Sequence, residues 1–189
     1  MTDLAFQCRC GALKGSVMGA SPSVGTHAEC FCASCRAAEL YSGAPDPAPG
    51  PVGIFQTTPH RIELTSGQEH LAVFSFGEKN LLRWQASCCG STLFNTPRNP
   101  KLSFVGIRTN LFADPTAIGP VVAQAFIAAA QGKTKHKGLL KVVGGALKRI
   151  AISRVTGRWK ETPFFDPSTL EPTRAVTVLP KGTRDKVLP

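Results

Sequence analysis

Seven cysteines, gathered in three short segments, are the residues of this chain whose types and spacing could do chemistry. Residues 8–10 are Cys-Arg-Cys, residues 30–35 are Cys-Phe-Cys-Ala-Ser-Cys, and Cys88 and Cys89 stand together before Gly90. Thiolates one or two residues apart can turn their sulfurs toward one small cation, and a following glycine lets backbone amides approach those sulfurs. Thiolate-rich ligand sets select zinc over magnesium or calcium. The spacing therefore predicts zinc, with one or two ions per chain.

Three other interpretations of these cysteines compete with metal binding. A disulfide framework is typical of small secreted domains, but residues 1–7 contain neither a basic nor an apolar export segment, so a cytoplasmic location is expected. Isolated core cysteines have no reason to gather within two residues of one another. A redox dithiol at Cys32 and Cys35 would need a βαβ setting, which the surrounding sequence does not offer. A thiol redox sensor would exchange with disulfides only when free of metal.

The net charge of +10 lies in the second half of the chain. Residues 1–100 contain seven basic and seven acidic residues, whereas residues 101–189 contain fifteen basic and five acidic ones. A neutral cysteine-rich half suits a small-molecule site, while the basic half could face nucleic acid, an anionic membrane surface or solvent. No nucleic-acid motif accompanies the basic residues, and over residues 126–160, where most of them lie, only Phe126 and Trp159 offer stacking. A nucleic-acid partner is therefore not favoured.

Length and hydropathy indicate one globular domain, or one domain with an appendage. The chain has 189 residues, of which 42% are hydrophobic, and this is enough for a substantial core. The longest apolar run, residues 120–130, is interrupted by Gln124 and is about half as long as a membrane-crossing helix. We expect no membrane span, and the sequence carries no signal of oligomeric state.

The first hundred residues predict an all-β region in which turns hold the cysteines. Short runs of strand-forming residues between turn residues predict strands at 13–17, 60–65, 71–76, 81–85 and 91–94. Residues 42–51, rich in proline and glycine, predict a surface loop that follows the three-cysteine segment.

The second half predicts helices. Apolar residues recur at helical spacing over 120–132, with proline at the start and Gly132 as a stop. A second helix is predicted over 139–152, weakened at Gly144 and Gly145 by about 1 kcal/mol per glycine. The proline-containing last twenty-five residues should follow the surface or remain mobile.

The order Cys-x-Cys-Gly, then Cys-x-Cys-x-x-Cys, then Cys-Gly-Ser resembles the glutathione-dependent formaldehyde-activating enzyme family, also called the centromere protein V family. The resemblance covers about residues 6–105. It implies a mainly β, zinc-binding β-tent domain with one structural and one catalytic zinc. Cys8 and Cys10 correspond to the first structural pair, Cys30, Cys32 and Cys35 to the catalytic thiolates, and Cys89 to the closing motif.

One departure affects the structural site. The family closes this site with Cys-x-x-Cys-Gly, which would require cysteine at Ala86, but here the partner of Cys89 is displaced to Cys88. Adjacent cysteines bind one metal together only if the peptide between them is strained. Either Cys88 ligates in that way, or another residue provides the fourth ligand.

The chemistry that the resemblance implies is carbon–sulfur bond formation or cleavage on a glutathione adduct such as S-hydroxymethylglutathione. Three thiolates leave zinc one open tetrahedral position, which suits a substrate thiol. A fourth ligand from His27 or Glu29 would instead close the site and make it structural. Arg36 could bind a carboxylate of an anionic tripeptide or face solvent. Tyr41 is expected to pack against the core rather than line a pocket.

The sequence thus predicts two regions, a cysteine-rich zinc-binding β domain over residues 1–115 and a basic helical extension with a proline-containing tail over 116–189. The favoured activity is a zinc-dependent carbon–sulfur lyase with glutathione or another small thiol as its partner. The alternative is a non-catalytic zinc module whose basic C-terminal region binds an anionic partner.

Overall fold

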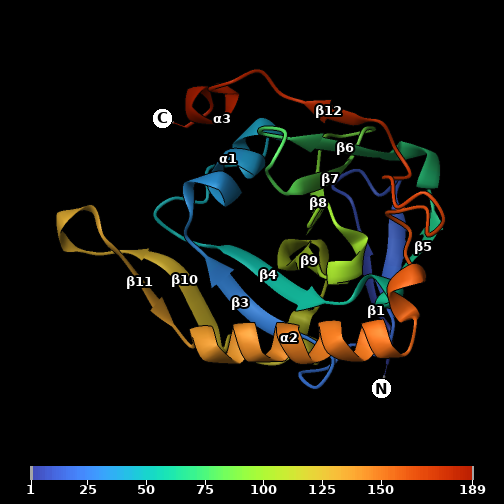
Figure 1. The fold of residues 1–189 in the computed structure, drawn as a ribbon. Coiled ribbons are helices and arrows are strands. Elements are labelled where there is room, and N and C mark those ends of the chain that lie inside the picture. Colours follow the sequence, from blue (N-terminus) through green and yellow to red (C-terminus); the bar gives the residue numbers. More distant parts are fainter. Residues whose placement is uncertain (1, 189) are drawn as a thin grey trace.

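The computed structural model describes residues 2–188, whose strands form one small and one large sheet (Figure 1). The small sheet is antiparallel, in the order β1-β2-β5, and comprises β1 (Leu4–Gln7), β2 (Lys14–Val17) and β5 (Ile62–Ser66). The turn from β1 to β2 carries the first cysteine pair. Gly11 lies in this turn at φ +75°, a left-handed conformation that favours glycine.

The large sheet has the order β11-β10-β3-β4-β9-β8-β7-β6-β12. Its neighbours are antiparallel except that β10 runs parallel to β3 and β12 runs parallel to β6. The strands are β3 (Thr26–Cys30), β4 (Val52–Thr57), β6 (Leu71–Ser75), β7 (Leu82–Ala86), β8 (Thr92–Thr96), β9 (Val105–Arg108), β10 (Ala123–Ala128), β11 (Thr134–Lys137) and β12 (Val176–Val178).

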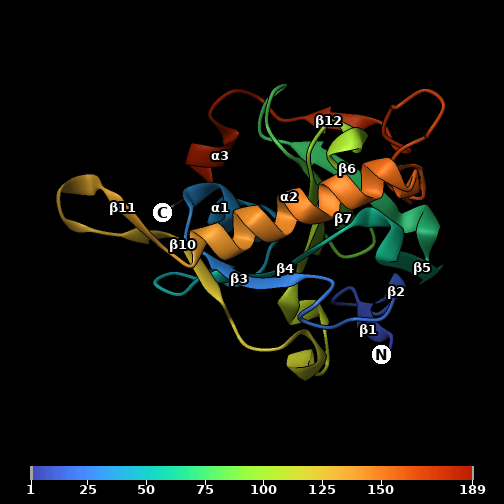
Figure 2. The same cartoon turned by 60° about the horizontal axis from the view of Figure 1, so that its bottom comes forward.

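Helices cover parts of this framework. They are α1 (Ala33–Tyr41), α2 (Leu139–Val155) and α3 (Thr183–Lys186). Helix α1 connects β3 to β4, and α2 packs along β10, β3 and β4, as Figure 2 shows from a second direction. None of the helices within residues 2–188 combines the length and the apolar character that crossing a membrane requires.

The main core lies between the two sheets and is rich in aromatic residues. Trp84 of β7 is fully buried, and its indole N–H donates to Thr96 Oγ1 at 2.9 Å. Phe164 packs on this indole with ring centroids 5.0 Å apart, and on Phe94 at 5.1 Å. A residue far along the chain therefore completes the core of the first hundred residues.

The five predicted strands are confirmed as β2, β5, β6, β7 and β8, with boundaries shifted by one or two residues. The prediction of an all-β first half was wrong at α1, which begins directly after Cys32. The Cys32 sulfur caps this helix by accepting the Cys35 N–H, as a serine or threonine oxygen does more commonly. Residues 42–51 form the predicted loop.

The prediction of a helix over 120–132 was wrong, because residues 123–128 of that segment form β10. The Val122 N–H donates to the His27 carbonyl, and Ala123 to Ala125 pair in parallel with Ala28 to Cys30 of β3. Pairing with a preformed strand outweighed the helical spacing of the apolar residues. The helix predicted over 139–152 is confirmed as α2, and at Gly145 the absence of a side chain permits close approach to Thr26.

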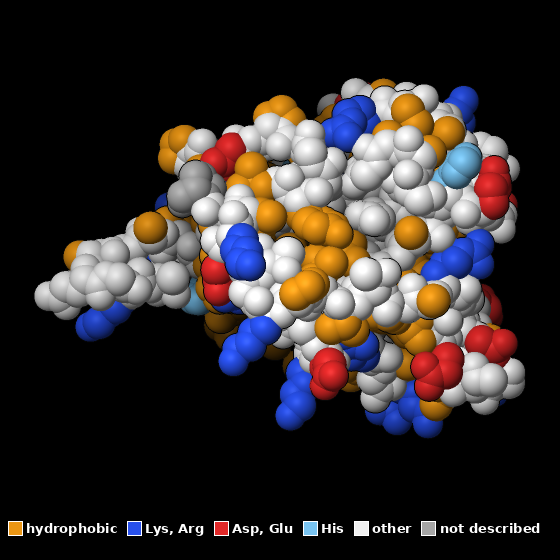
Figure 3. Space-filling model, turned by 90° about the horizontal axis from the view of Figure 1, so that it is seen from above, with side chains coloured by type: hydrophobic (Ala, Val, Ile, Leu, Met, Phe, Trp, Pro, Cys, Tyr) orange, Lys and Arg blue, Asp and Glu red, His pale blue; other side chains and the backbone are white. Residues whose placement is uncertain are grey.

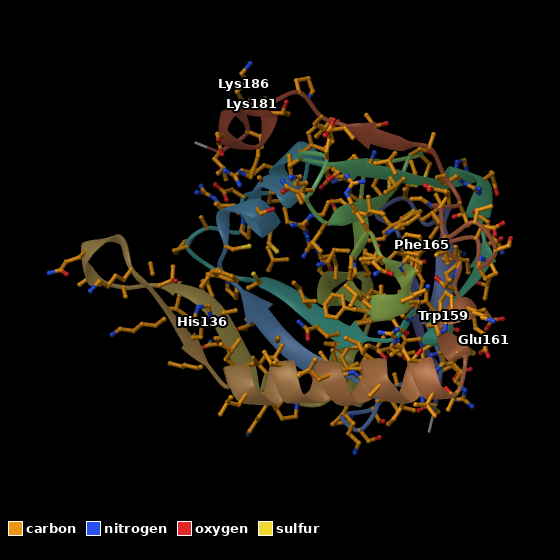
Figure 4. The ribbon with its side chains drawn as sticks, in the orientation of Figure 1. His136, Trp159, Glu161, Phe165, Lys181 and Lys186 are labelled. Atoms are coloured by element: carbon orange, nitrogen blue, oxygen red, sulfur yellow. The ribbon has the colours of Figure 1, made fainter. Side chains whose placement is uncertain are left out.

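Residues 116–188 contribute to the same sheet and core as residues 2–115. Strand β10 extends the sheet beyond β3, β12 adds an edge to β6, and Phe164 and Phe165 are buried in the main core. The last residues follow the surface, where Lys181 and Lys186 project around α3 (Figure 4). The division at residue 115 stays a prediction, and the structure gives these later residues a structural role.

Candidate metal centres

The first cluster joins four cysteines from two hairpin turns. The sulfurs of Cys8, Cys10, Cys88 and Cys89 all lie within 4.8 Å of one another. Cys8 Sγ is 3.6 Å from Cys10 Sγ and 3.8 Å from Cys88 Sγ, and the Cys10 and Cys88 sulfurs are 3.4 Å apart. A tetrahedron with metal–sulfur bonds of about 2.3 Å has edges of about 3.8 Å. The four sulfurs could therefore hold a zinc-sized ion.

Backbone turns place these sulfurs. The Leu13 N–H donates to Cys8 Sγ at 3.3 Å, and the Gly11 N–H donates to the Cys8 carbonyl at 2.9 Å. Across the cluster, the Gly90 N–H donates to the Ala86 carbonyl at 2.7 Å, with Gly90 at φ +76°. This turn between β7 and β8 brings both adjacent cysteines to the cluster. Cys88 and Cys89 are therefore both near enough to serve as the third and fourth ligands.

The thiols of this cluster differ in how readily they lose their protons. Partial burial raises the pKa of Cys89, but hydrogen bonds from Ser91 and Cys10 outweigh it and bring this pKa to about 6. Desolvation, with the neighbouring Cys10 and Cys8 thiols, raises the pKa of Cys88 to about 12. Because thiols bind metals as thiolates, metal binding would release the protons that remain.

The second cluster forms where β3 meets α1. The sulfurs of Cys30, Cys32 and Cys35 lie within 4.8 Å of one another. Cys30 ends β3, Cys32 caps α1, and Cys35 lies in the first turn of the helix, where it is buried. The helix dipole places partial positive charge at this end, which favours thiolates.

No fourth His, Cys, Asp or Glu within residues 2–188 joins these three sulfurs. The two residues that the sequence offered as candidates for a closing ligand, His27 and Glu29, make hydrogen bonds elsewhere. His27 Nδ1 lies 2.8 Å from the Gly119 carbonyl, and the Glu29 carboxylate accepts from Gln124 Nε2 at 2.7 Å. The cluster therefore offers a cation three thiolates and one open direction.

Two buried arginines give this cluster a positive environment. Arg83 Nη1 lies 3.9 Å from Cys35 Sγ, and Arg83 Nη2 donates to Ser34 Oγ at 3.0 Å. Arg108 is buried and pairs with Glu39 of α1, with Nε and Oε1 2.8 Å apart. Hydrogen bonds from the Cys30 and Cys32 thiols, and then the charges of Arg108 and Arg83, lower the pKa of Cys35 well below its usual range. The surroundings thus favour the thiolate form at Cys35.

A pocket of about 550 Å³ opens over the three cysteines. It is lined by Cys30, Cys32, Cys35, Arg83 and Asn95, among others, and by residues of β10 and α2 that are mostly apolar. No pattern in the sequence predicts that segments about one hundred residues apart line one pocket. Arg83 and Asn95 were missed as site residues, although an arginine within the apolar run of residues 81–84 was a usable signal.

Helix α1 links the two clusters. The three-cysteine cluster lies at its first turn, and Arg9 of the four-cysteine cluster reaches its last turn. The Arg9 guanidinium donates to the Gly43 carbonyl at 3.2 Å, to the Ser42 carbonyl at 3.3 Å and to the Cys89 carbonyl. One arginine thus fixes the position of the first cluster relative to the end of α1.

Two other residues singled out in the sequence have clear partners. Arg36 forms a bidentate pair with Asp46, with Nε–Oδ1 and Nη2–Oδ2 distances of 2.7 and 2.5 Å. Its predicted role toward a substrate carboxylate stays a prediction. Tyr41 packs on Phe74 and Phe76 with centroid distances of 4.7 and 6.2 Å, which confirms the packing role.

His60 lies outside both clusters and predicts a pH effect on stability. Neither ring nitrogen has a hydrogen-bond partner among the described residues, and burial, with the charges of Arg61 and Arg158, lowers the pKa of His60. The unfolded chain therefore binds a proton at pH values where the folded chain does not, so stability falls as pH drops below about 6.5. In urea unfolding at pH 7.5 and 5.5, His60→Gln should lose less free energy of unfolding between these pH values than wild type does, whereas the control His70→Gln, at a partly exposed histidine, should lose as much as wild type.

Comparisons with known proteins point to a family without an assigned function. No curated protein matches the chain. A Rhodobacter sphaeroides protein of known crystal structure is 20% identical, with 62% of this chain and 97% of that chain covered and a TM-score of 0.45. The signature of the family of unknown function DUF6151 matches residues 2–166. The chain belongs to this family.

Proposed function

We propose that this protein is a zinc-dependent carbon–sulfur lyase that acts on the adduct of a thiol with a small aldehyde. One observation carries the proposal: Cys30, Cys32 and Cys35 face a pocket with no fourth protein ligand among the described residues. The order of cysteines resembles that of the formaldehyde-activating family, whose members have a β-tent fold. This resemblance supports the same activity. The four-cysteine cluster would hold a second, structural zinc.

The proposed reaction is the reversible addition of a thiol to formaldehyde. The thiol sulfur forms a bond to the carbonyl carbon, the carbon–oxygen π bond breaks, and the thiol proton ends on the oxygen. Cleavage runs the same steps backward, and neither direction needs an oxidant or reductant. Zinc held by three thiolates would supply an open position that lowers the pKa of the substrate thiol.

The residues around the cluster take two roles in this proposal. Of the described residues that line the pocket, Glu29 alone carries a carboxylate, and it would accept the thiol proton and return it to oxygen. Arg83, buried beside Cys35, offsets the negative charge that accumulates when a fourth sulfur joins three thiolates. Glu29 is oriented by the hydrogen bond from Gln124.

Exchange NMR with ¹³C-formaldehyde tests the activity directly. Zinc-loaded protein should accelerate exchange between the free aldehyde and its thiol adduct, measured with both glutathione and 2-phenylethanethiol. Cys30→Ser should abolish the acceleration, whereas Glu29→Gln should slow it while the zinc content stays unchanged. Exchange at the uncatalysed rate with both thiols, in protein that retains two zinc ions, would refute the proposal.

Arg83 and Arg36 are expected to differ in their effect on thiol binding. Arg83→Gln should weaken binding by about tenfold, because it removes a buried cation beside the sulfurs. Arg36→Gln should change binding by less than about twofold, because Asp46 already occupies this exposed guanidinium. Titration calorimetry on the zinc-loaded proteins gives both ratios. A larger effect at Arg36 would assign substrate recognition to that residue instead.

The alternative, a non-catalytic zinc module that binds an anionic partner, rests on the exposed lysines of the β10–β11 hairpin. Lys133, Lys135 and Lys137 are all exposed. In the face seen in Figure 3, however, Lys and Arg are scattered and interspersed with acidic side chains rather than gathered in one patch. Substituting the three lysines by glutamate should weaken retention on heparin and DNA only as much as the lower net charge requires. Abolished binding to a duplex that wild type binds tightly would favour the alternative.

A further inference from the structure

The pocket over the three cysteines has two chemically different sides. The segment from β3 to α1 supplies the sulfurs, and β7 and β8 supply Arg83 and Asn95, while β10, which lies beside β3 in the same sheet, and α2 supply lining residues after 120. These later residues are largely apolar, namely Ala123, Ala125, Phe126, Leu139, Val142 and Ile150. The basic C-terminal extension therefore contributes an apolar wall to the candidate active site.

We propose that this wall selects thiols with a bulky apolar group, so that the site takes an alkyl or arylalkyl thiol adduct in preference to the glutathione adduct. The inference rests on the proposed function and names its substrate class. An apolar body of the substrate would lie against β10 and α2 while its sulfur reaches the three cysteines.

Exposed apolar side chains around the pocket support this choice. Phe126 and Leu139 retain 45% and 44% of their surface, and Leu81 and Leu102 on the opposite rim retain 40% and 42%. Water covers these side chains in the free protein, and an apolar ligand would remove that contact. Figure 4 shows His136 at the base of the β10–β11 arm, and its ring packs edge-on against Phe126 at 5.0 Å. That contact holds Phe126 at the rim.

The charged residues of the pocket fit glutathione poorly. Glutathione carries two carboxylates and an ammonium group, and each would need a partner once it leaves water. The charged lining residues Glu29, Arg83 and Lys137 belong to other parts of the pocket. The lining residues of α2, Leu139, Val142 and Ile150, are all apolar. A charged group of glutathione that lay against α2 would therefore have no partner there.

Asn95 offers one place for a small polar group. It is 5% exposed, and its Oδ1 has no hydrogen-bond partner among the described residues. Asn95 pairs across the strands with Arg83 on one side and Gly106 on the other, and a Cβ at Gly106 would collide with this oxygen. The missing side chain at Gly106 thus gives space to this oxygen, and in the proposed complex the oxygen would accept the hydroxyl hydrogen of a hydroxymethyl adduct while the apolar group of the substrate points toward α2.

Cobalt-substituted protein tests the inference, because visible absorption reports a new sulfur at the metal. Difference spectra would be recorded during titration with 2-phenylethanethiol and, separately, with glutathione, so that the four-cysteine site contributes a constant background. We expect half-saturation at an at least tenfold lower concentration for 2-phenylethanethiol. Val142→Asp and Phe126→Ala should each reduce that preference several-fold, mainly by raising the half-saturating concentration of 2-phenylethanethiol. Leu140→Asp is the matched control, since Leu140 is 88% exposed and does not line the pocket.

The outcomes separate the two proposals. If glutathione binds as tightly as 2-phenylethanethiol, or if neither pocket variant changes the preference, the apolar substrate class is wrong and the lyase proposal stands. If neither thiol changes the spectrum of protein that holds two cobalt ions, the open thiol site and this inference both fail. Phe126→Ala keeps the test decisive if Val142→Asp does not fold, because Phe126 lies on the exposed arm.

Discussion

Replacement of Cys8 by serine is expected to remove one metal ion per chain and to lower the free energy of unfolding by at least about 3 kcal/mol. Cys8 is 1% exposed and joins the turn of one hairpin to the turn of another, so its loss separates segments eighty residues apart. A structural zinc site contributes its binding free energy to folding, because the unfolded chain has no preformed site. Elemental analysis and urea unfolding measure the two effects.

Cys30→Ser is the matched control for that change. It should also remove one metal ion, but the loss of stability should be smaller, because the three-cysteine cluster lies within one β3–α1 connection and borders an open pocket. Equal destabilisation by the two variants would contradict the assignment of separate structural and open sites. Unchanged metal content in Cys8→Ser would show that the four-cysteine cluster holds no ion.

Phe164→Ala is expected to cost about 3–5 kcal/mol, although it lies far outside the cysteine-rich region. Its ring is fully buried and packs on both Trp84 and Phe94, so truncation to alanine leaves a cavity among these rings. Phe126→Ala, at a side chain that is 45% exposed, should cost less than about 1 kcal/mol. Chemical denaturation of both variants gives the comparison.

That experiment also tests the predicted division at residue 115. If Phe164→Ala costs less than about 1 kcal/mol, residues 116–189 would be an independent appendage, as the sequence suggested. A large cost would show that the first region is completed by the second. The pairing of β10 with β3 favours this second result, because removing β10 exposes the edge of β3 next to Cys30.

The cysteine clusters could be predicted from the sequence because ligand spacing is local. Residues 8–10 and 30–35 each lie in one turn or one strand–helix junction, so their sulfurs converge whatever the rest of the chain does. The role of the adjacent pair Cys88 and Cys89 was harder to predict, since its geometry depends on the hairpin turn that ends at Gly90.

The pocket could not be predicted because it depends on contacts between distant segments. Residues 120–132 show helical spacing, but β3 offers an edge to which residues 123–125 pair, and a strand results. That single change carries the chain over the cysteines and brings α2 beside them. Asn95 gave no signal in the sequence, because its unpaired amide matters only beside Arg83 and Gly106 in the folded sheet.

The most direct test of the account is the number of metal ions per chain, measured by elemental analysis together with thiol binding by calorimetry. The proteins to compare are wild type and the triple variant Cys30→Ser/Cys32→Ser/Cys35→Ser. We predict two zinc ions in wild type and one in the variant, with binding of 2-phenylethanethiol lost. The contrary result would be one zinc ion in both proteins, with wild type binding neither this thiol nor glutathione. It would contradict the open site and leave a structural zinc protein.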